Sequence, residues 1–201
     1  MEIKKKAQFI TDFYGGSPSI GEEGILKYWI ETRQDKALLS FADQNQKKGE
    51  TAIDMLSNIL SVFHRDKDGN PILGNWMLRR CLVITGLSIF NAMKDRSHPK
   101  KDIIPMAVQI IEPVHINIHN GKLVKQPDGV KTYTISKKEG GKTRSFFKAY
   151  ELIKAGTTFE STMYFDDELM NEEQINMLLS KAGSVGVGAF RERFGKFEWV
   201  G

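Results

Sequence analysis

The residues best suited to chemistry lie near the end of the chain, in the stretch "AGSVGVGAFRERFGKFEWVG". Its glycines lack a Cβ atom, so backbone N–H groups there can approach a phosphate closely. Its arginines and lysine can supply the countercharge for such an anion. This candidate phosphate-binding loop consists of Gly186, Gly188, Arg191, Arg193, Gly195 and Lys196.

The order of the elements around this loop limits what it can bind. The sequence predicts a helix before the loop and a strand after it, over 194–200. A dinucleotide-binding glycine fingerprint needs the reverse order, with a strand first and a helix after it, so dinucleotide binding is not supported. Two interpretations remain open: contact with a nucleic-acid phosphate, or a plain tight connection between a helix and an edge strand.

A second candidate surface lies in the basic segment 121–154. The segment holds nine Lys and Arg residues against three Asp and Glu, a net charge of +6, whereas the whole chain carries +4. Aromatic residues alternate with cations in "KTRSFFKAY", and such rings can stack on unpaired bases while the cations follow the backbone. An exposed lysine-rich hairpin kept soluble by its charge is the alternative. The candidate binding residues here are Lys142, Arg144, Phe146 and Lys148.

The sequence offers little for catalysis or for metal binding. His115 and His119 are four residues apart, but their neighbours predict a strand, in which that separation spans roughly 13 Å, too far for one metal. No Walker loop, HExxH, GxSxG or CxxC pattern is present. We therefore expect no catalytic residue, no metal and no cofactor, and an enzyme is the less favoured class. A general acid–base role for one of the four histidines stays open.

Hydrophobic periodicity predicts the elements that position these residues. Helices are predicted over 50–64 and 76–94, followed from 103 onward by strands. A last helix over 171–183 begins with Asn171 as its cap and is expected to end at Gly183. This order predicts an α+β fold: a modified RRM-like, or ferredoxin-like, antiparallel sheet with helices on one face. We expect a single domain over 1–201, with a basic β-hairpin inserted at about 120–150.

The chain has the features of a cytoplasmic protein. No run of about 18 apolar residues is present, so we expect no transmembrane helix and no membrane partner. The single cysteine, Cys81, lies in an apolar helical stretch and cannot form an internal disulfide. We interpret it as a buried thiol in a reducing compartment.

Two motifs resemble the RAMP superfamily, the RNA-binding proteins of CRISPR effector complexes. The segment "DKDGNPILGNWMLRRCL" resembles the turn that leads into the first helix of that superfamily, and "LLSKAGSVGVGAFRERFGKFEWV" resembles its C-terminal glycine-rich loop. A set of uncharacterised bacteriophage proteins shares this layout. The resemblance covers roughly 9–200 in element order, although only the two motifs are specific. It implies an RRM-like core and carries the family's basic helix positions over to Arg79 and Arg80.

The motifs and the resemblance together favour one function and leave two alternatives. The favoured function is non-catalytic binding of single-stranded nucleic acid, RNA rather than DNA, by a phage-encoded protein in the cytoplasm of a bacterial host. The resemblance also implies that copies of the chain assemble side by side along the strand. The first alternative is a protein-interaction module, either a phage structural subunit or an inhibitor of a host defence complex. The second is a metal-independent endoribonuclease.

Overall fold

The computed structural model describes residues 1–18, 48–49, 51, 54, 60–92, 103–111, 114–118, 121–139, 141–189, 191 and 193–200. Its helices are α4 (Asn75–Ala92), α5 (Ile104–Ala107) and α6 (Glu172–Val185). Its strands are β1 (Glu2–Phe9), β2 (Phe13–Tyr14), β3 (Ser17–Pro18), β4 (Leu60–Val62), β5 (His64–Arg65), β6 (Pro71–Leu73), β7 (Val108–Ile111), β8 (Val114–Asn117), β9 (Gly129–Glu139), β10 (Lys142–Ile153), β11 (Thr158–Phe165) and β12 (Phe197–Trp199). Within the described residues, no helix is both long enough and apolar enough to span a bilayer.

The chain forms two compact units, each built from segments that are distant in the sequence. The first unit comprises Met1–Tyr14, His64–Gln126 and Ile153–Gly201. The second comprises Gly15–Phe63 and Pro127–Leu152. The candidate phosphate-binding loop belongs to the first unit, and the β9–β10 hairpin belongs almost entirely to the second.

The first unit has an antiparallel sheet in the order β12-β1-β11-β8-β6-β5, with β7 also paired to β11. β1 lies between β12 and β11, and β7 and β8 pair with successive parts of β11 on its other side. In chain order the core elements are β1, α4, β7 with β8, β11, α6 and β12. This connectivity and strand order are those of a ferredoxin-like fold, so the predicted α+β class is confirmed.

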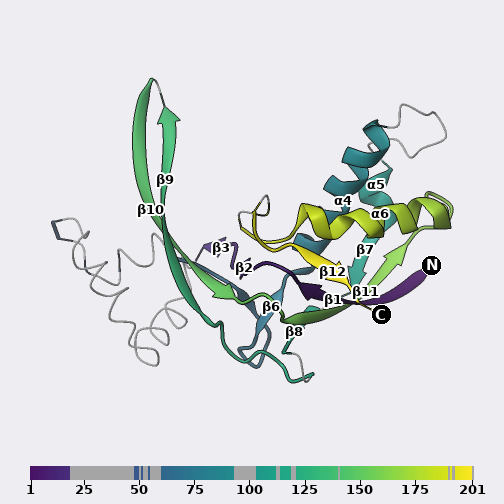
Figure 1. The fold of residues 1–201 in the computed structure, drawn as a ribbon, viewed down its shortest axis with the longest axis horizontal. Coiled ribbons are helices and arrows are strands. Elements are labelled where there is room, and N and C mark those ends of the chain that lie inside the picture. The colour runs from purple at the N-terminus through teal and green to yellow at the C-terminus, as the bar shows by residue number, and fades with distance from the viewer. Residues whose placement is uncertain are drawn as a thin grey trace. The chain divides into compact units, whose positions relative to one another are not determined.

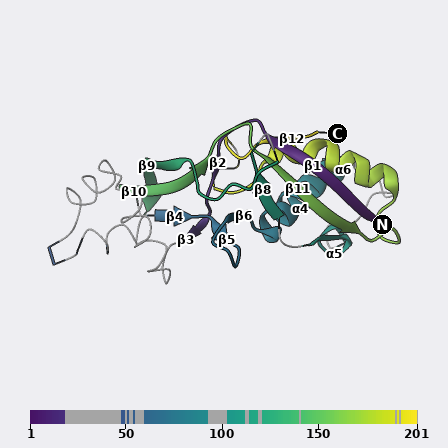
Figure 2. The same ribbon diagram turned by 90° about the horizontal axis from the view of Figure 1, so that it is seen from below.

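The helices of the first unit lie on one face of its sheet (Figures 1 and 2). α4 packs against α6 and β7, and α6 packs against β12. Alternate residues of the two central strands point into this layer, so that Phe9 of β1 and Phe159 and Met163 of β11 are fully buried. The ring centroids of Phe9 and Phe159 are 5.1 Å apart. The sheet therefore has one apolar face, covered by helices, as a half-buried antiparallel sheet requires.

The motif "DKDGN" forms the turn between β5 and β6. Gly69 has a φ of 81°, and the Asp66 N–H donates to the Asn70 carbonyl over 2.9 Å. The helix predicted over 50–64 is wrong where its last part is described, because Leu60–Val62 is β4 and His64 begins β5. Spacings of three and four also occur by chance in buried strands, and here cross-strand pairing outweighs the local pattern.

The second unit is built around β10. β9 pairs with β10 in an antiparallel hairpin, β4 pairs with β10 in parallel, and β3 pairs with β4. The buried carboxylate of Glu151 accepts a hydrogen bond of 2.9 Å from the Phe63 N–H, and the Glu151 carbonyl accepts one from the Gly15 N–H. These contacts attach two segments to β10: the residue that follows β4 and a residue between β2 and β3.

Candidate nucleic-acid interface

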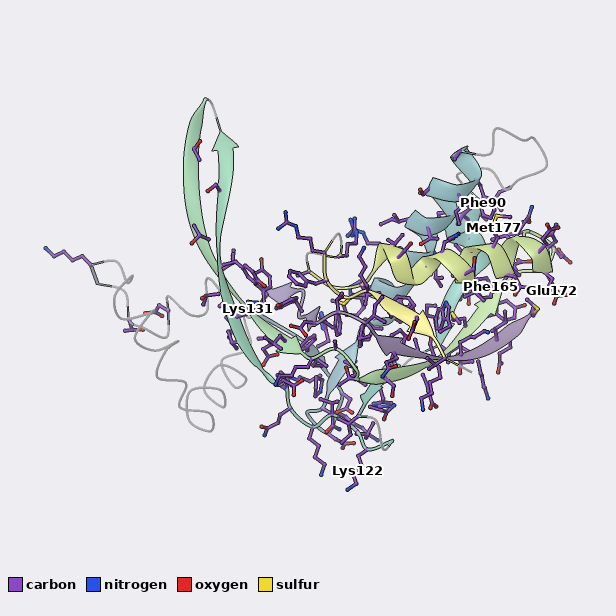
Figure 3. The ribbon with its side chains drawn as sticks, in the orientation of Figure 1. Phe90, Lys122, Lys131, Phe165, Glu172 and Met177 are labelled. Carbon is purple, nitrogen blue, oxygen red and sulfur yellow. The ribbon has the colours of Figure 1, made fainter. Side chains whose placement is uncertain are left out.

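The helix α6 leads the chain into the candidate phosphate-binding loop. Asn171 caps its N-terminus, as predicted, and the acids Glu172 and Glu173 occupy the first turn. The structure shows in addition that Asn171 and Gln174 form a capping box. Glu172 lies at the end of α6 away from the loop (Figure 3). The predicted C-terminus at Gly183 is wrong, because α6 continues to Val185 and Gly186 is its C-cap, with a φ of 78°.

The glycines of the loop are required by its conformation. Gly186, Gly188 and Gly195 all have positive φ values, between 65° and 78°. A Cβ atom on Gly195 would lie 2.0 Å from the Val187 carbonyl oxygen, and one on Gly188 would lie 2.5 Å from the Tyr14 carbonyl oxygen. The backbone therefore packs too closely at these positions for any side chain.

Several backbone N–H groups of the loop donate within the chain. The Val187 N–H donates to the Gly195 carbonyl over 3.0 Å, and the Gly195 N–H donates to the Asp12 carbonyl over 2.7 Å. The Ala189 N–H donates to the Tyr14 carbonyl over 3.3 Å. These bonds hold the loop against the segment that follows β1. The glycines thus fix the shape of the loop, and its cationic side chains are the groups best placed to meet an anion.

Two of the predicted cations are held by backbone carbonyls. The Lys196 ammonium donates to the carbonyls of Ser184 and Val185, at 3.1 Å for Val185, and so offsets the negative end of the α6 dipole. The Arg79 guanidinium donates from Nε to the Val108 carbonyl over 2.9 Å and also to the Pro105 carbonyl. Both side chains therefore stabilise the junctions between elements.

Three arginines of the first unit remain as candidate anion ligands. Arg80 and Arg193 are exposed and Arg191 is partly exposed. Among the residues that the structure describes, none of the three side chains makes an ion pair or a hydrogen bond. Unpaired guanidinium groups are well suited to phosphate, because their donors match its oxygens in a bidentate fork.

The buried thiol of Cys81 links the start of α4 to the end of α6. Its S–H donates to the Ala182 carbonyl over 3.1 Å. Burial raises the pKa of the Cys81 thiol to about 12, while the charges of Lys196 and Arg191 act in the opposite direction. Cys81 is buried, as the sequence predicted.

The remaining predicted residues lie on β10. Pairing with β9 places Lys142, Arg144, Phe146 and Lys148 at alternate positions of the strand, and hence on the same face of the hairpin. Lys148 is half-buried. The side chains of the other three lie outside the part of the chain that the structure describes. The pairing also brings Lys131 and Tyr133 of β9 to this face, and sequence reasoning missed both residues because it could not assign the register.

A histidine–aspartate pair is a further feature that the sequence did not reveal. His115 of β8 has its Nδ1 atom 3.6 Å from the Oδ2 atom of Asp66. Hydrogen bonds from the Asn70 side chain, and from the backbone N–H groups of Asn70 and Asp68, lower the pKa of Asp66 below its usual value. The turn therefore keeps a carboxylate beside the imidazole ring. The sequence gives no signal for this pair, because 49 positions separate Asp66 from His115.

The row of residues across β5, β6 and β8 adds a second histidine. His64 is paired with Ile72, and Ile72 is paired with His115, so the three share one face of the sheet. The ring of Trp76 lies edge-on to the His64 ring, with centroids 4.4 Å apart. Within the described residues, no group of three or more His, Cys, Asp and Glu residues could hold a metal ion.

Comparison with known proteins finds likeness only among solved structures. No protein-family model matches the chain, and no curated protein matches it. Among solved structures, the crystal structure of Cmr6 from Pyrococcus furiosus is similar, with a TM-score of 0.39 and 12% sequence identity. That match covers 100% of this chain and 98% of Cmr6. Because the TM-score is low, the fold assignment rests on the strand order and connectivity described above.

Proposed function

We propose that this protein binds single-stranded nucleic acid without catalysis, with RNA rather than DNA as its ligand. The observation that carries the proposal is that Arg191 and Arg193 of a loop of fixed shape, and Arg80 of α4, make no ion pair or hydrogen bond among the described residues. The role of the basic hairpin, the phage origin and the assembly of copies along a strand belong to the same proposal. They rest on the charge pattern and on the two motifs quoted above.

The electrostatics of α6 explain why the arginines are needed. The C-terminal end of a helix carries a partial negative charge, which repels phosphate. Lys196 offsets that charge locally, because its ammonium group donates to the last carbonyls of α6. An anion near the loop is therefore attracted by Arg191 and Arg193, whose charges are not used elsewhere among the described residues. Contacts of this kind position a strand without reading its sequence.

The double variant Arg191→Ala with Arg193→Ala tests this proposal. We expect it to bind labelled single-stranded RNA more weakly, and by the same factor for unrelated sequences, because phosphates are common to all of them. Each lost phosphate contact should reduce the slope of log affinity against log salt by about 0.7, so the double variant should lose about 1.4. Filter binding at several salt concentrations measures both quantities.

The matched control removes two exposed lysines from the opposite face of the sheet. Lys4 and Lys6 of β1 are exposed, and their loss changes the net charge by the same amount. If Lys4→Ala with Lys6→Ala weakens binding as much as the arginine variant does, the loop is not the binding site. If the unaltered protein fails to bind single-stranded RNA even at low salt, the proposed function is wrong.

The His115–Asp66 pair favours metal-independent RNA cleavage as a second candidate function. The Nδ1 atom of His115 is buried and lies 3.6 Å from the Asp66 carboxylate, so Nε2 is the ring nitrogen assigned to contact the RNA in this candidate. In such a reaction the 2′-oxygen bonds to phosphorus as His115 takes its proton. The bond from phosphorus to the 5′-oxygen then breaks, and a protonated histidine such as His64 supplies the proton to that leaving oxygen. Asp66 would act as a positioning residue.

Incubation of structured RNA with the protein in EDTA tests this second candidate. Discrete products ending in a cyclic phosphate are expected, and the His115→Ala variant should abolish them. Asp66→Asn should reduce the rate, because it removes the carboxylate that lies 3.6 Å from the His115 ring. If the RNA remains intact in EDTA, or if His115→Ala cleaves as fast as the unaltered protein, this candidate is excluded.

A further inference from the structure

The two faces of the β9–β10 hairpin differ sharply in composition. Cross-strand partners share a face, so the register divides the hairpin between Lys131 and Glu151 into two sets. The basic face consists of Lys131, Tyr133, Ile135, Lys137, Glu139, Lys142, Arg144, Phe146, Lys148 and Tyr150. The threonine face consists of Val130, Thr132, Thr134, Ser136, Lys138, Thr143, Ser145, Phe147, Ala149 and Glu151. Figure 1 shows the two strands running side by side.

Charge is confined almost entirely to the basic face. That face has five Lys and Arg residues against one Glu, whereas the threonine face has one Lys against one Glu. The threonine face is exposed at Thr132, Thr134 and Thr143 and is buried at Ala149 and Glu151, so it serves as a core face at one end of the hairpin but not along its length. Burial of the threonine face therefore does not explain why the Lys and Arg residues gather on the other face along most of the hairpin.

The pairing of like charges across the two strands lowers the stability of the hairpin. Lys137 lies directly opposite Arg144, and like charges in that position destabilise a β-pair. The basic face also carries rings, which partly compensate. The ring centroids of Tyr133 and Tyr150 are 6.2 Å apart, and the Lys131 ammonium is 5.7 Å from the Tyr133 ring centroid. Aromatic pairs of this kind help a hairpin to form, but the opposed cations do not. An anionic ligand on the basic face would remove their repulsion.

We propose that the basic face of the hairpin is a binding surface of its own for an unpaired nucleic-acid strand. This inference rests on the proposed function and adds to it the face, the strandedness of the ligand and the residues Lys131, Tyr133 and Lys137. The side chain of Lys131 is exposed on β9 (Figure 3). From Lys131 to Lys137 the strand rises by roughly 20 Å, enough to follow several nucleotides.

The mixture of rings and cations is what selects an unpaired strand. In the register of the hairpin, Tyr133 and Phe146 occupy positions between those of the cations. We expect rings at such positions to stack on bases while the cations meet phosphates. In a duplex the bases are already stacked on each other, so their faces are not accessible to a ring. The basic face also has no Asn or Gln, the residues that pair with adenine edges in a duplex groove.

Neighbouring residues on opposite faces provide a matched test. Lys137→Ala and Lys138→Ala each remove one lysine, one position apart, and Phe146→Ala and Phe147→Ala each remove one ring. We expect Lys137→Ala to lower the slope of log affinity against log salt by about 0.7, and Lys138→Ala to leave it unchanged. We expect Phe146→Ala to weaken binding to a single strand about tenfold, and Phe147→Ala to have little effect on it.

Two fluorescently labelled probes are compared. The first is a uridine oligomer of about 15 nucleotides, a length within the range of known single-strand-binding sites. The second is a duplex of the same length. Fluorescence anisotropy with the full chain gives each affinity, and urea unfolding shows that each variant is folded. The unaltered protein should bind the single strand at least tenfold more tightly than the duplex. If the phenylalanine variants fail to fold, the two lysine variants decide the question.

The possible outcomes separate this inference from the proposed function. Equal effects of the variants on the two faces overturn the inference, and the proposed function stands if Arg191→Ala with Arg193→Ala still weakens binding. Equal affinity for duplex and single strand, with no effect of Phe146→Ala, also overturns the inference and indicates that the hairpin enters a groove. If the unaltered protein binds neither probe at low salt, the inference and the proposed function both fail.

Discussion

Replacing Gly183 with alanine is expected to lower the free energy of unfolding by about 3 kcal/mol or more, at the top of the range for overpacking. A Cβ atom at this position would lie 1.7 Å from the carbonyl oxygen of Phe197, a backbone atom of β12. β12 pairs with β1, so it cannot move away without losing that pairing. The expected result is separation of α6 from the sheet edge, or loss of the native fold, measured by urea unfolding.

A glycine in the other long helix provides the control. In α4, a Cβ atom on Gly86 would lie 2.9 Å from a methyl group of Ile104, which is a side-chain atom and can adjust. Alanine also has a helix propensity about 1 kcal/mol better than that of glycine. We therefore expect Gly86→Ala to change stability by less than about 1 kcal/mol, since overpacking and propensity oppose each other. Equal stability of the two variants would contradict the close approach of α6 to β12.

Raising the salt concentration from 50 to 200 mM is expected to weaken binding of single-stranded RNA by a factor that depends on how many cations take part. If only Arg80, Arg191 and Arg193 neutralise phosphates, the slope of log affinity against log salt is about −2.1, and the affinity falls about 20-fold. If the five cations of the basic face take part as well, the slope of log affinity against log salt is about −5.6 and the loss is about two-thousandfold. Counterion release is the physical reason in both cases.

Anisotropy titrations at four or more salt concentrations measure this slope. The far-ultraviolet circular dichroism spectrum, recorded at each concentration, shows that the fold is unchanged. A slope near −2 indicates that only Arg80, Arg191 and Arg193 contact phosphates. A slope near −6 indicates that the cations of the basic face contact phosphates as well. Binding that is insensitive to salt would contradict both proposals, because each includes phosphate contacts whose counterion release makes affinity depend on salt.

Some of the fold could be predicted from the sequence because its signals are local. Asn171 followed by Gln174 three residues later is a capping box that depends only on adjacent backbone, and α6 begins there. The apolar run of α4 and the alternation of β11 likewise carry their own periodicity. These local signals also led to the correct α+β class, because the order of helices and strands allows few sheet topologies.

Other parts could not be predicted because distant residues determine them. The apolar residues over 50–64 have helical spacing, but Leu60–Val62 forms β4. Pairing with β3 and β10 stabilises an extended backbone there. Gly183 is a residue type that often ends a helix, yet it lies inside α6. A glycine is needed there because β12 passes too closely for a side chain. The division of the chain into two units depends in the same way on contacts between distant segments.

The candidate site shows the same division. The sequence by itself determined the residue types: glycines with arginines near the end of the chain, and cations alternating with rings in the hairpin. Only the tertiary structure decided that Lys196 is held by the end of α6, that Arg191 and Arg193 keep their charges available among the described residues, and which hairpin residues share a face. The physical reason is that charge and shape belong to single residues, whereas hydrogen-bond partners and strand register are set by segments that meet only when the chain has folded.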